Sequence, residues 1–163
     1  MAKKLPVIRD GYCLFLSGYL SNWAAFSFVL DDVKYSSTEQ AFMAAKAKQA
    51  GDHETVALIM ATSDCKEQKR LGRATKNFVP EAWDDIKFDT VYRACFAKFD
   101  QNPDIKKALL ETGNLILAEA ADYDCVWGIG LSADHPDATN PSKWKSQNLL
   151  GQILMKVRAN LSQ

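Results

Sequence analysis

The sequence predicts a mainly helical protein with a few short β-strands, an α+β fold, and three observations support this prediction. Residues 36–51 combine a helix-capping motif, several alanines and a terminal glycine, which together are typical of a helix. Residues 83–99 and 148–161 repeat apolar side chains at the i, i+3, i+4 spacing of a buried helix face. Short apolar runs before and after the helical middle are consistent with buried strands.

The N-terminal part of the chain predicts one strand and one hairpin. Residues 12–16 are a short apolar run that turn-forming residues follow. Residues 26–30 and 33–35 predict a β-hairpin, because Asp31 and Asp32 stand between them as a two-residue turn. The hairpin leads directly into the first predicted helix.

That helix has a strong N-terminal signal. Ser37 is a natural N-cap, and Gln40 three residues later completes a capping box. Ser36 is an alternative cap, with Glu39 as its capping-box partner. Gly51 is placed to end the helix.

The rest of the chain predicts four more helices, one strand and one irregular loop. They are a helix capped by Asp64 with Glu67 as its partner, a helix over residues 83–99, a helix from Asn102 to Gly113, a strand over residues 115–118, a loop over residues 132–145 and a helix capped by Asn148. The chain has no internal repeat, low-complexity tract or linker. We therefore expect one domain over residues 1–163, with its core at roughly residues 10–162.

The composition is that of an ordinary globular protein. Twenty basic residues balance twenty acidic ones among 163 residues, and 47% of the chain is hydrophobic. A dedicated nucleic-acid binder usually has a basic excess, so we expect nucleic acid only as a modified substrate.

One segment is locally basic, and we interpret it as a solvated helix face, with a phosphate-binding patch as the alternative. Its residues are Lys66, Lys69, Arg70, Arg73 and Lys76.

The cysteine and histidine pattern predicts a cytoplasmic protein without a metal ion or cofactor. The four cysteines lie far apart in apolar surroundings, so we expect buried free thiols in a reducing compartment. His53 and His135 stand in unrelated polar segments, which does not predict a zinc site. The N-terminus lacks the apolar run of a signal peptide, and no apolar stretch approaches the length of a membrane span.

The first helix carries the first candidate site. Glu39, Met43 and Lys46 fall at i, i+4 and i+7 and therefore share one face. If this face is buried, its carboxylate and amine must be paired or functional. The structural alternative is that Lys46 extends its charged end to the surface.

The segment that follows the last predicted strand carries the second candidate site. Glu119 stands at the end of an apolar run, where functional sites are often built. Gly128 and Gly130 flank Ile129 and permit close approach of the backbone to a ligand. The helix N-terminus at Asn148 is suited to an anion such as phosphate.

Several motifs occur in an order and spacing that are specific to one family. They are an aromatic run from Phe15 that ends in Ser21-Asn22-Trp23; Ser37-Thr38-Glu39-Gln40 with Lys46; Lys98 to Asn102; Leu110 to Gly113; Glu119, Asp124 and Trp127-Gly128-Ile129-Gly130; and Asn148-Leu149-Leu150-Gly151 with Arg158. Together they resemble the NADAR family, which includes N-glycosidases that act on early riboflavin intermediates. The resemblance spans nearly the whole chain and implies a mostly helical fold.

The resemblance implies cleavage of the C–N bond between ribose or ribose phosphate and a base or amine. Early riboflavin-pathway aminopyrimidine ribosyl phosphates are substrates of this kind. Two alternatives stay open: an ADP-ribosyl hydrolase that frees a modified base such as guanine in DNA, and a non-catalytic module that binds NAD or ADP-ribose. In each case the partner is a ribosyl phosphate or ADP-ribosyl compound, and the oligomeric state stays undetermined.

The residue types fit this chemistry. Glu39, Glu119 and Asp124 are the acids available to stabilise positive charge on the sugar or to move protons. We interpret Lys46 as an amine nucleophile that forms a Schiff base, with phosphate binding as the alternative role. Substrate binding is assigned to Asn22, Trp23, Trp127, Gly128, Gly130 and Asn148. We expect the catalytic residues and Trp127 to line one pocket.

Overall fold

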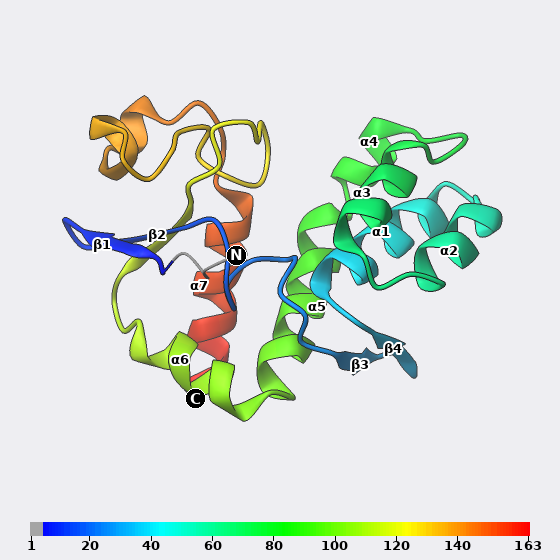
Figure 1. Cartoon of the computed structure of the whole chain (residues 1–163), viewed down its shortest axis with the longest axis horizontal. Coiled ribbons are helices and arrows are strands. Elements are labelled where there is room, and N and C mark those ends of the chain that lie inside the picture. The colour runs from blue at the N-terminus through cyan, green and yellow to red at the C-terminus, as the bar shows by residue number, and fades with distance from the viewer. Residues whose placement is uncertain (1–4) are drawn as a thin grey trace. The chain divides into compact units, whose positions relative to one another are not determined.

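The computed structural model of the chain describes residues 5–163, and it confirms the mainly helical fold with a few short strands (Figure 1). The first four residues of the expected domain lie outside the described part. Within the described part there are seven α-helices, two short 3-10 helices and five strands in two small sheets.

The strands are β1 (Val7–Arg9), β2 (Tyr12–Phe15), β3 (Phe28–Leu30), β4 (Val33–Tyr35) and β5 (Ile116–Glu119). The α-helices are α1 (Thr38–Gln49), α2 (His53–Met60), α3 (Cys65–Arg73), α4 (Pro80–Asp84), α5 (Lys87–Asp100), α6 (Pro103–Glu111) and α7 (Leu149–Leu161). The 3-10 helices are η1 (Pro136–Thr139) and η2 (Pro141–Lys143).

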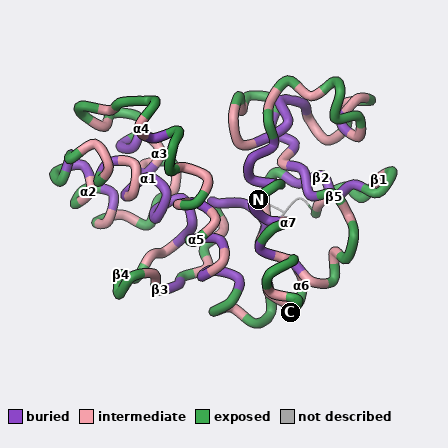
Figure 2. The backbone as a smooth tube through the Cα atoms, turned by 180° about the vertical axis from the view of Figure 1, so that it is seen from behind, coloured by how far each residue is buried: buried purple, intermediate pink, exposed green. Residues whose placement is uncertain are grey.

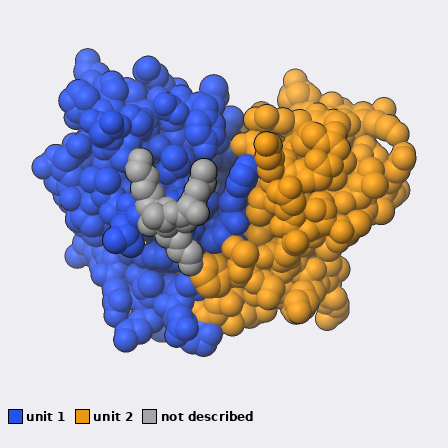
Figure 3. All heavy atoms as spheres, viewed as in Figure 1, with its two compact units in different colours: residues 1–24, 103–163 blue, residues 25–102 orange. Residues whose placement is uncertain are grey.

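The chain forms two compact units (Figure 3). The described residues of unit 1 are 5–24 and 103–163, and unit 2 comprises residues 25–102.

Unit 1 is built on a three-stranded sheet in the order β1-β2-β5. β2 pairs with β1 in antiparallel and with β5 in parallel orientation, and the parallel register places Phe15 opposite Glu119. All four residues of β2 are buried, and α7 packs against β5 (Figure 2). β1 is absent from the predicted strands, because Val7 and Ile8 are both exposed and show no alternation.

The junction between β5 and α7 is unusually close. Asn148 adopts a left-handed conformation with φ 53°, and its Nδ2 donates to Leu117 O at 3.0 Å. Its Oδ1 accepts from Glu119 N at 3.1 Å, so the side chain binds the strand. The prediction that this side chain caps α7 was wrong, because it makes no hydrogen bond to the first turn of the helix. A Cβ atom on Gly151 would overlap the carbonyl oxygen of Leu117. Gly151 therefore lets the first turn of α7 lie directly on β5.

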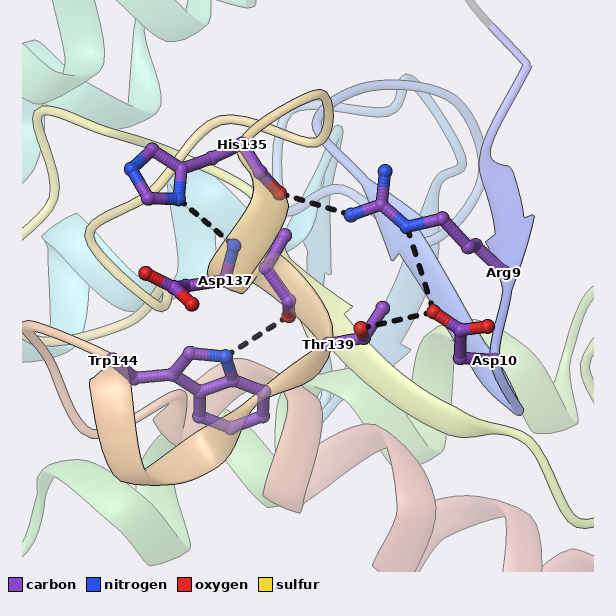
Figure 4. A network of polar contacts seen from close by, with 7 residues as sticks. Arg9, Asp10, His135, Asp137, Thr139 and Trp144 are labelled. Carbon is purple, nitrogen blue, oxygen red and sulfur yellow. Dashed lines mark hydrogen bonds and ion pairs between the residues drawn. The ribbon is translucent and has the colours of Figure 1, made fainter.

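A polar network joins the loop over residues 132–145 to the hairpin of β1 and β2 (Figure 4). Arg9 donates to the carbonyl oxygen of His135 at 2.9 Å, and the Thr139 hydroxyl donates to Asp10 at 3.2 Å. Trp144 Nε1 donates to Ala138 O at 3.0 Å. The loop that the sequence analysis expected to be irregular thus contains η1 and η2 and has its own buried contacts.

Unit 2 is organised around α1, which packs against α2, α3 and α5. Ser37 is its N-cap and accepts from Gln40 N at 3.1 Å, as predicted. Gln40 Oε1 accepts from the backbone of Ser36 at 2.7 Å, so Ser36 is not the cap. The predicted hairpin before α1 is confirmed, with Asp31 and Asp32 at φ 50° and 62° in the turn.

Two local predictions in unit 2 were wrong. The helix expected over residues 83–99 is divided, since α4 ends at Asp84 and α5 begins at Lys87. Trp83 belongs to α4 and stacks on Phe42 of α1 with ring centroids 5.6 Å apart. Asp64 caps α3 as expected, but Glu67 forms an ion pair with Arg70 at 2.6 Å and takes no part in the cap.

Replacing Gly151 tests the close junction of α7 with β5. Gly151→Ala should lower the free energy of unfolding by about 1–3 kcal/mol, because the new methyl group overlaps the Leu117 carbonyl. Alanine is intrinsically the better helix former by about 1 kcal/mol, so the sign of the change is decisive. Urea denaturation measures it, and a stabilised variant would contradict the close approach.

Replacing Asn148 tests its bond to β5. Asn148→Asp keeps an acceptor for Glu119 N but removes the donor to Leu117 O, so we expect a loss of about 1–3 kcal/mol at neutral pH. The loss should shrink in acid, where the introduced carboxyl is protonated and donates again. The control is Asn114→Asp at an exposed position, which should change little. Equal effects of the two substitutions would contradict the structural role of Asn148.

Candidate active site

The first candidate site lies in unit 2 on α1. Glu39 stands in the first turn of the helix and is only 4% exposed. Lys46 follows two turns later and is half-buried, with its Nζ 4.3 Å from the centroid of the Phe78 ring. The positive end of the helix dipole favours a carboxylate in the first turn. An acid and an amine therefore share one largely enclosed helix.

The Lys46 amine has an environment that favours its neutral form. Burial lowers the pKa of Lys46, the positive charge of Arg73 lowers it further, and Glu39 opposes both. Desolvation and a neighbouring cation are the two means by which proteins activate a lysine as a nucleophile. Arg73 belongs to the basic segment predicted to be a solvated helix face, and only the packing of α3 on α1 identifies it as a neighbour of Lys46.

The Cys65 thiol near Glu39 has an environment that disfavours its thiolate form. Cys65 Sγ lies 3.4 Å from the Ser37 hydroxyl. Burial raises the pKa of Cys65, and the negative charge of Glu39 contributes to the rise. The thiolate form is therefore disfavoured at neutral pH.

A second buried amine lies on α5. Lys98 is 1% exposed, and its Nζ lies 4.8 Å from the centroid of the Phe99 ring. Burial lowers the pKa of Lys98 to about 8. Lys98 is not among the predicted site residues, although a lysine within the apolar run from Cys95 to Phe99 is a signal in the sequence.

The second candidate site lies in unit 1, where β5 ends. The Glu119 side chain is half-buried, and its backbone carbonyl accepts from Ala121 N at 3.0 Å and from Ile129 N at 2.9 Å. A Cβ atom on Gly128 would lie 2.8 Å from that same carbonyl. Gly128 therefore lets the chain return to the end of the strand after a loop of acidic residues.

Asp124 shapes this loop. Its Oδ1 accepts from Val126 N at 2.8 Å and from Trp127 N at 2.6 Å. Both bonds stabilise the turn that presents the half-buried Trp127. Gly130 has φ 71°, a conformation that glycine adopts most readily.

An exposed tyrosine accompanies the two acids. Tyr123 is 68% exposed, and burial of part of its ring raises the pKa of its hydroxyl. The negative charges of Glu119 and Asp124 raise this pKa further. Tyr123 is not among the predicted site residues, because an aromatic residue in a loop carries no spacing signal.

The aromatic loop after β2 holds the last two predicted residues. Asn22 is buried, whereas Trp23 is 44% exposed. The backbone N–H of Trp23 donates to the Ser21 hydroxyl at 3.1 Å. Trp23 thus offers a partly open ring face, as stacking on a ligand requires.

The predicted residues are distributed over the two units. Unit 2 holds Glu39 and Lys46. Unit 1 holds Asn22, Trp23, Glu119, Asp124, Trp127, Gly128, Gly130 and Asn148. Asn148 uses both atoms of its amide on the backbone of β5, so its assignment to substrate binding stays a prediction. The same holds for the expectation that the catalytic residues share one pocket.

Three other features bear on function. No group of three or more histidine, cysteine, aspartate or glutamate side chains suited to a metal ion occurs among residues 5–163. Within the same range, no helix has the length and apolar character needed to cross a membrane. Cys13 and Cys95 are buried as expected, but Cys125 is exposed because it lies in the acidic loop after β5.

Comparison with known proteins identifies the family. The NADAR domain matches residues 15–162. An N-glycosidase of Acanthamoeba polyphaga mimivirus is 46% identical over 77% of this chain and 74% of its own. The riboflavin biosynthesis protein PYRR of Arabidopsis thaliana is 30% identical over 66% of this chain and 17% of its own. The NMR structure of the Escherichia coli protein YbiA is similar with a TM-score of 0.78 at 27% identity, covering 96% of this chain and 88% of that one. Because the family match takes in nearly all of the chain, including residues of both units, the chain belongs to the NADAR domain family.

Proposed function

We propose that this chain is an N-glycosidase, a hydrolase that cleaves the C–N bond between a ribose phosphate and a base or amine. The observation that carries the proposal is the placement of a buried acid and an activated amine, Glu39 and Lys46, on one helix. The likeness to proteins named N-glycosidases from a virus and from bacteria supports it. The likeness to the plant protein PYRR supports a substrate of the riboflavin pathway, such as an aminopyrimidine ribosyl phosphate.

Cleavage of this bond places positive charge on the sugar as the nitrogen leaves. A nearby carboxylate stabilises that charge and moves protons between the reacting groups. Glu39 suits this role because it is enclosed, so its interaction with a developing charge is only weakly screened by water.

The proposed reaction proceeds in three steps. The nitrogen lone pair opens the sugar ring, the ring oxygen takes a proton, and an iminium forms at C1′. The neutral Lys46 amine then adds to C1′, and the base or amine departs with a proton, which leaves a Schiff base on Lys46. Water finally adds to this Schiff base, releasing the open-chain sugar phosphate and restoring the amine.

The residues around the end of β5 are proposed to bind the substrate and assist proton transfer. Glu119 and Asp124 supply carboxylates, and the aromatic rings of Trp23 and Trp127 supply flat apolar surfaces for a base or a sugar. Asn148 is better suited to position Glu119 than to touch the ligand, since its Oδ1 accepts from the backbone of that residue. We also propose a cytoplasmic location, which the four free cysteines support.

Trapping the Schiff base tests the role of Lys46. Borohydride added during turnover of an aminopyrimidine ribosyl phosphate should leave a reduced sugar adduct on the peptide that contains Lys46. Lys46→Arg should remain folded but lose most turnover, because a guanidinium stays protonated and forms no Schiff base. Glu39→Gln should be slower by roughly 10²–10⁴-fold and should still bind the substrate.

The outcomes separate two possible amines. An adduct on the peptide that contains Lys98 would transfer the nucleophilic role to that residue. If no adduct forms and Lys46→Arg turns over normally, Lys46 is a binding residue and the carboxylates act alone. The two substrate classes are compared by offering the enzyme an ADP-ribosylated guanine nucleotide beside the ribosyl phosphate. Mass spectrometry then identifies the products.

The buried charge of Lys98 predicts a dependence of stability on pH. The pKa of Lys98 is about 8 in the folded protein, against 10.5 for an ordinary lysine. Below pH 8 the folded protein carries the buried charge, and the full free-energy cost of burying it lowers the stability. Between pH 8 and 10.5 the folded state has lost the proton while the unfolded chain keeps it. The free energy of unfolding of the parent protein therefore increases as the pH rises. The stability of Lys98→Met relative to the parent protein should therefore fall by about 2–3 kcal/mol between pH 7 and 10.

Urea denaturation of both proteins at a series of pH values measures this difference. The control is Lys48→Met, at an exposed position on α1, which should show no such trend. A constant difference for Lys98→Met across this range would contradict a lowered pKa of the buried amine.

A further inference from the structure

Arg73 has no acidic partner, unlike several other basic side chains of unit 2. Four of the others form ion pairs. These pairs are Arg70 with Glu67 at 2.6 Å, Lys76 with Glu54 at 2.9 Å, Lys87 with Asp84 at 2.6 Å and Arg93 with Asp31 at 2.7 Å. The guanidinium of Arg73 makes no hydrogen bond or ion pair with any residue that the structure describes. Its five donors are therefore available to a ligand.

The packing of α3 on α1 brings Arg73 to the candidate site. The two helices meet where Gly72 faces Met43, so closely that a Cβ atom on Gly72 would overlap the Met43 side chain. Arg73 directly follows Gly72, and Lys46 lies one helical turn beyond Met43. Gly72 thus lets two cations from different helices come together.

This arrangement leaves a concentration of positive charge that Glu39 balances only in part, since Arg73 acts on the pKa of Lys46 more strongly than Glu39 does. Lys46 also forms no ion pair within residues 5–163, and its Nζ faces the Phe78 ring. The repulsion is strong enough for Arg73 to lower the pKa of Lys46. An arginine at the end of a helix also interacts favourably with the helix dipole, which is the purely structural explanation for its presence.

We propose that Arg73 binds the phosphate group of a ribosyl phosphate and so aligns the sugar with the Lys46 amine. This inference rests on the proposed function and adds a recognition residue to it. A guanidinium suits phosphate because its planar donors form two parallel charge-assisted hydrogen bonds. The ligand class is a sugar carrying a phosphomonoester.

Arg73 also solves an electrostatic problem of the proposed reaction. A phosphate with two negative charges near Lys46 would favour the protonated, unreactive amine. A guanidinium paired with that phosphate offsets its charge, so the amine keeps its tendency to be neutral. Lysine binds phosphate less specifically than arginine, because its single ammonium group has no planar pair of donors.

Direct binding tests the proposal without any turnover. Ribose 5-phosphate and ribose are titrated calorimetrically into the parent protein and into Arg73→Gln. Loss of a charge-assisted contact should weaken binding of ribose 5-phosphate about 10–100-fold and leave ribose unchanged. Arg73→Lys should recover part of the loss. The matched control is Lys66→Gln, which removes an exposed charge from the other end of α3 and should bind ribose 5-phosphate normally.

Three results would overturn the proposal. They are normal binding of ribose 5-phosphate by folded Arg73→Gln, an equal loss for Lys66→Gln, and no binding of ribose 5-phosphate to the parent protein. If binding of ADP-ribose depends on Arg73 while binding of ribose 5-phosphate does not, the ligand is a diphosphate and the phosphomonoester is wrong. Failure of the proposed function looks different: ribose 5-phosphate would bind through Arg73, but no C–N bond would be cleaved.

Discussion

The burial of the Glu39 carboxylate is the constraint on which the arrangement of unit 2 depends. A carboxylate that is 4% exposed loses most of its hydration, and the surrounding structure must compensate. Its place in the first turn of α1 provides part of the compensation through the helix dipole. The capping residues Ser37 and Gln40 hold that turn in place, and Gln40 further donates to Ile59 O and Thr62 O at 3.2 and 3.0 Å. One short segment therefore joins the helix start to the end of α2.

In unit 1, hydrogen bonds and close backbone contacts hold the end of β5 in place. The end of β5 accepts hydrogen bonds from the backbone of Ala121 and Ile129, and the Asn148 side chain accepts from Glu119 N and donates to Leu117 O. Glycine at positions 128 and 151 permits close approach of the chain to the carbonyl groups of Glu119 and Leu117. These contacts fix the position of the Glu119 backbone. The Glu119 side chain and the loop that contains Asp124 then present the polar groups. Precise placement of carboxylates by rigid backbone is a common requirement of catalytic sites.

The basic residues of unit 2 illustrate how packing separates structural from functional charge. Arg70 and Arg73 are three residues apart in the same basic run, and both are exposed. Arg70 is neutralised by Glu67 on its own helix, so it contributes little beyond a surface ion pair. Arg73 lies at the helix crossing and acts electrostatically on Lys46. Spacing in the sequence cannot distinguish them, because the distinction depends on which helix lies opposite.

By itself the sequence determined the features that rest on local chemistry: the cap at Ser37, the turn at Asp31 and Asp32, and the buried face of α7. The family resemblance, carried by motif order, was equally available. Only the tertiary structure decided that Lys98 is buried, that Cys125 is exposed and that Arg73 is near Lys46. The reason is physical: capping and turn energies arise within a few residues, whereas burial and pKa depend on segments brought together by packing.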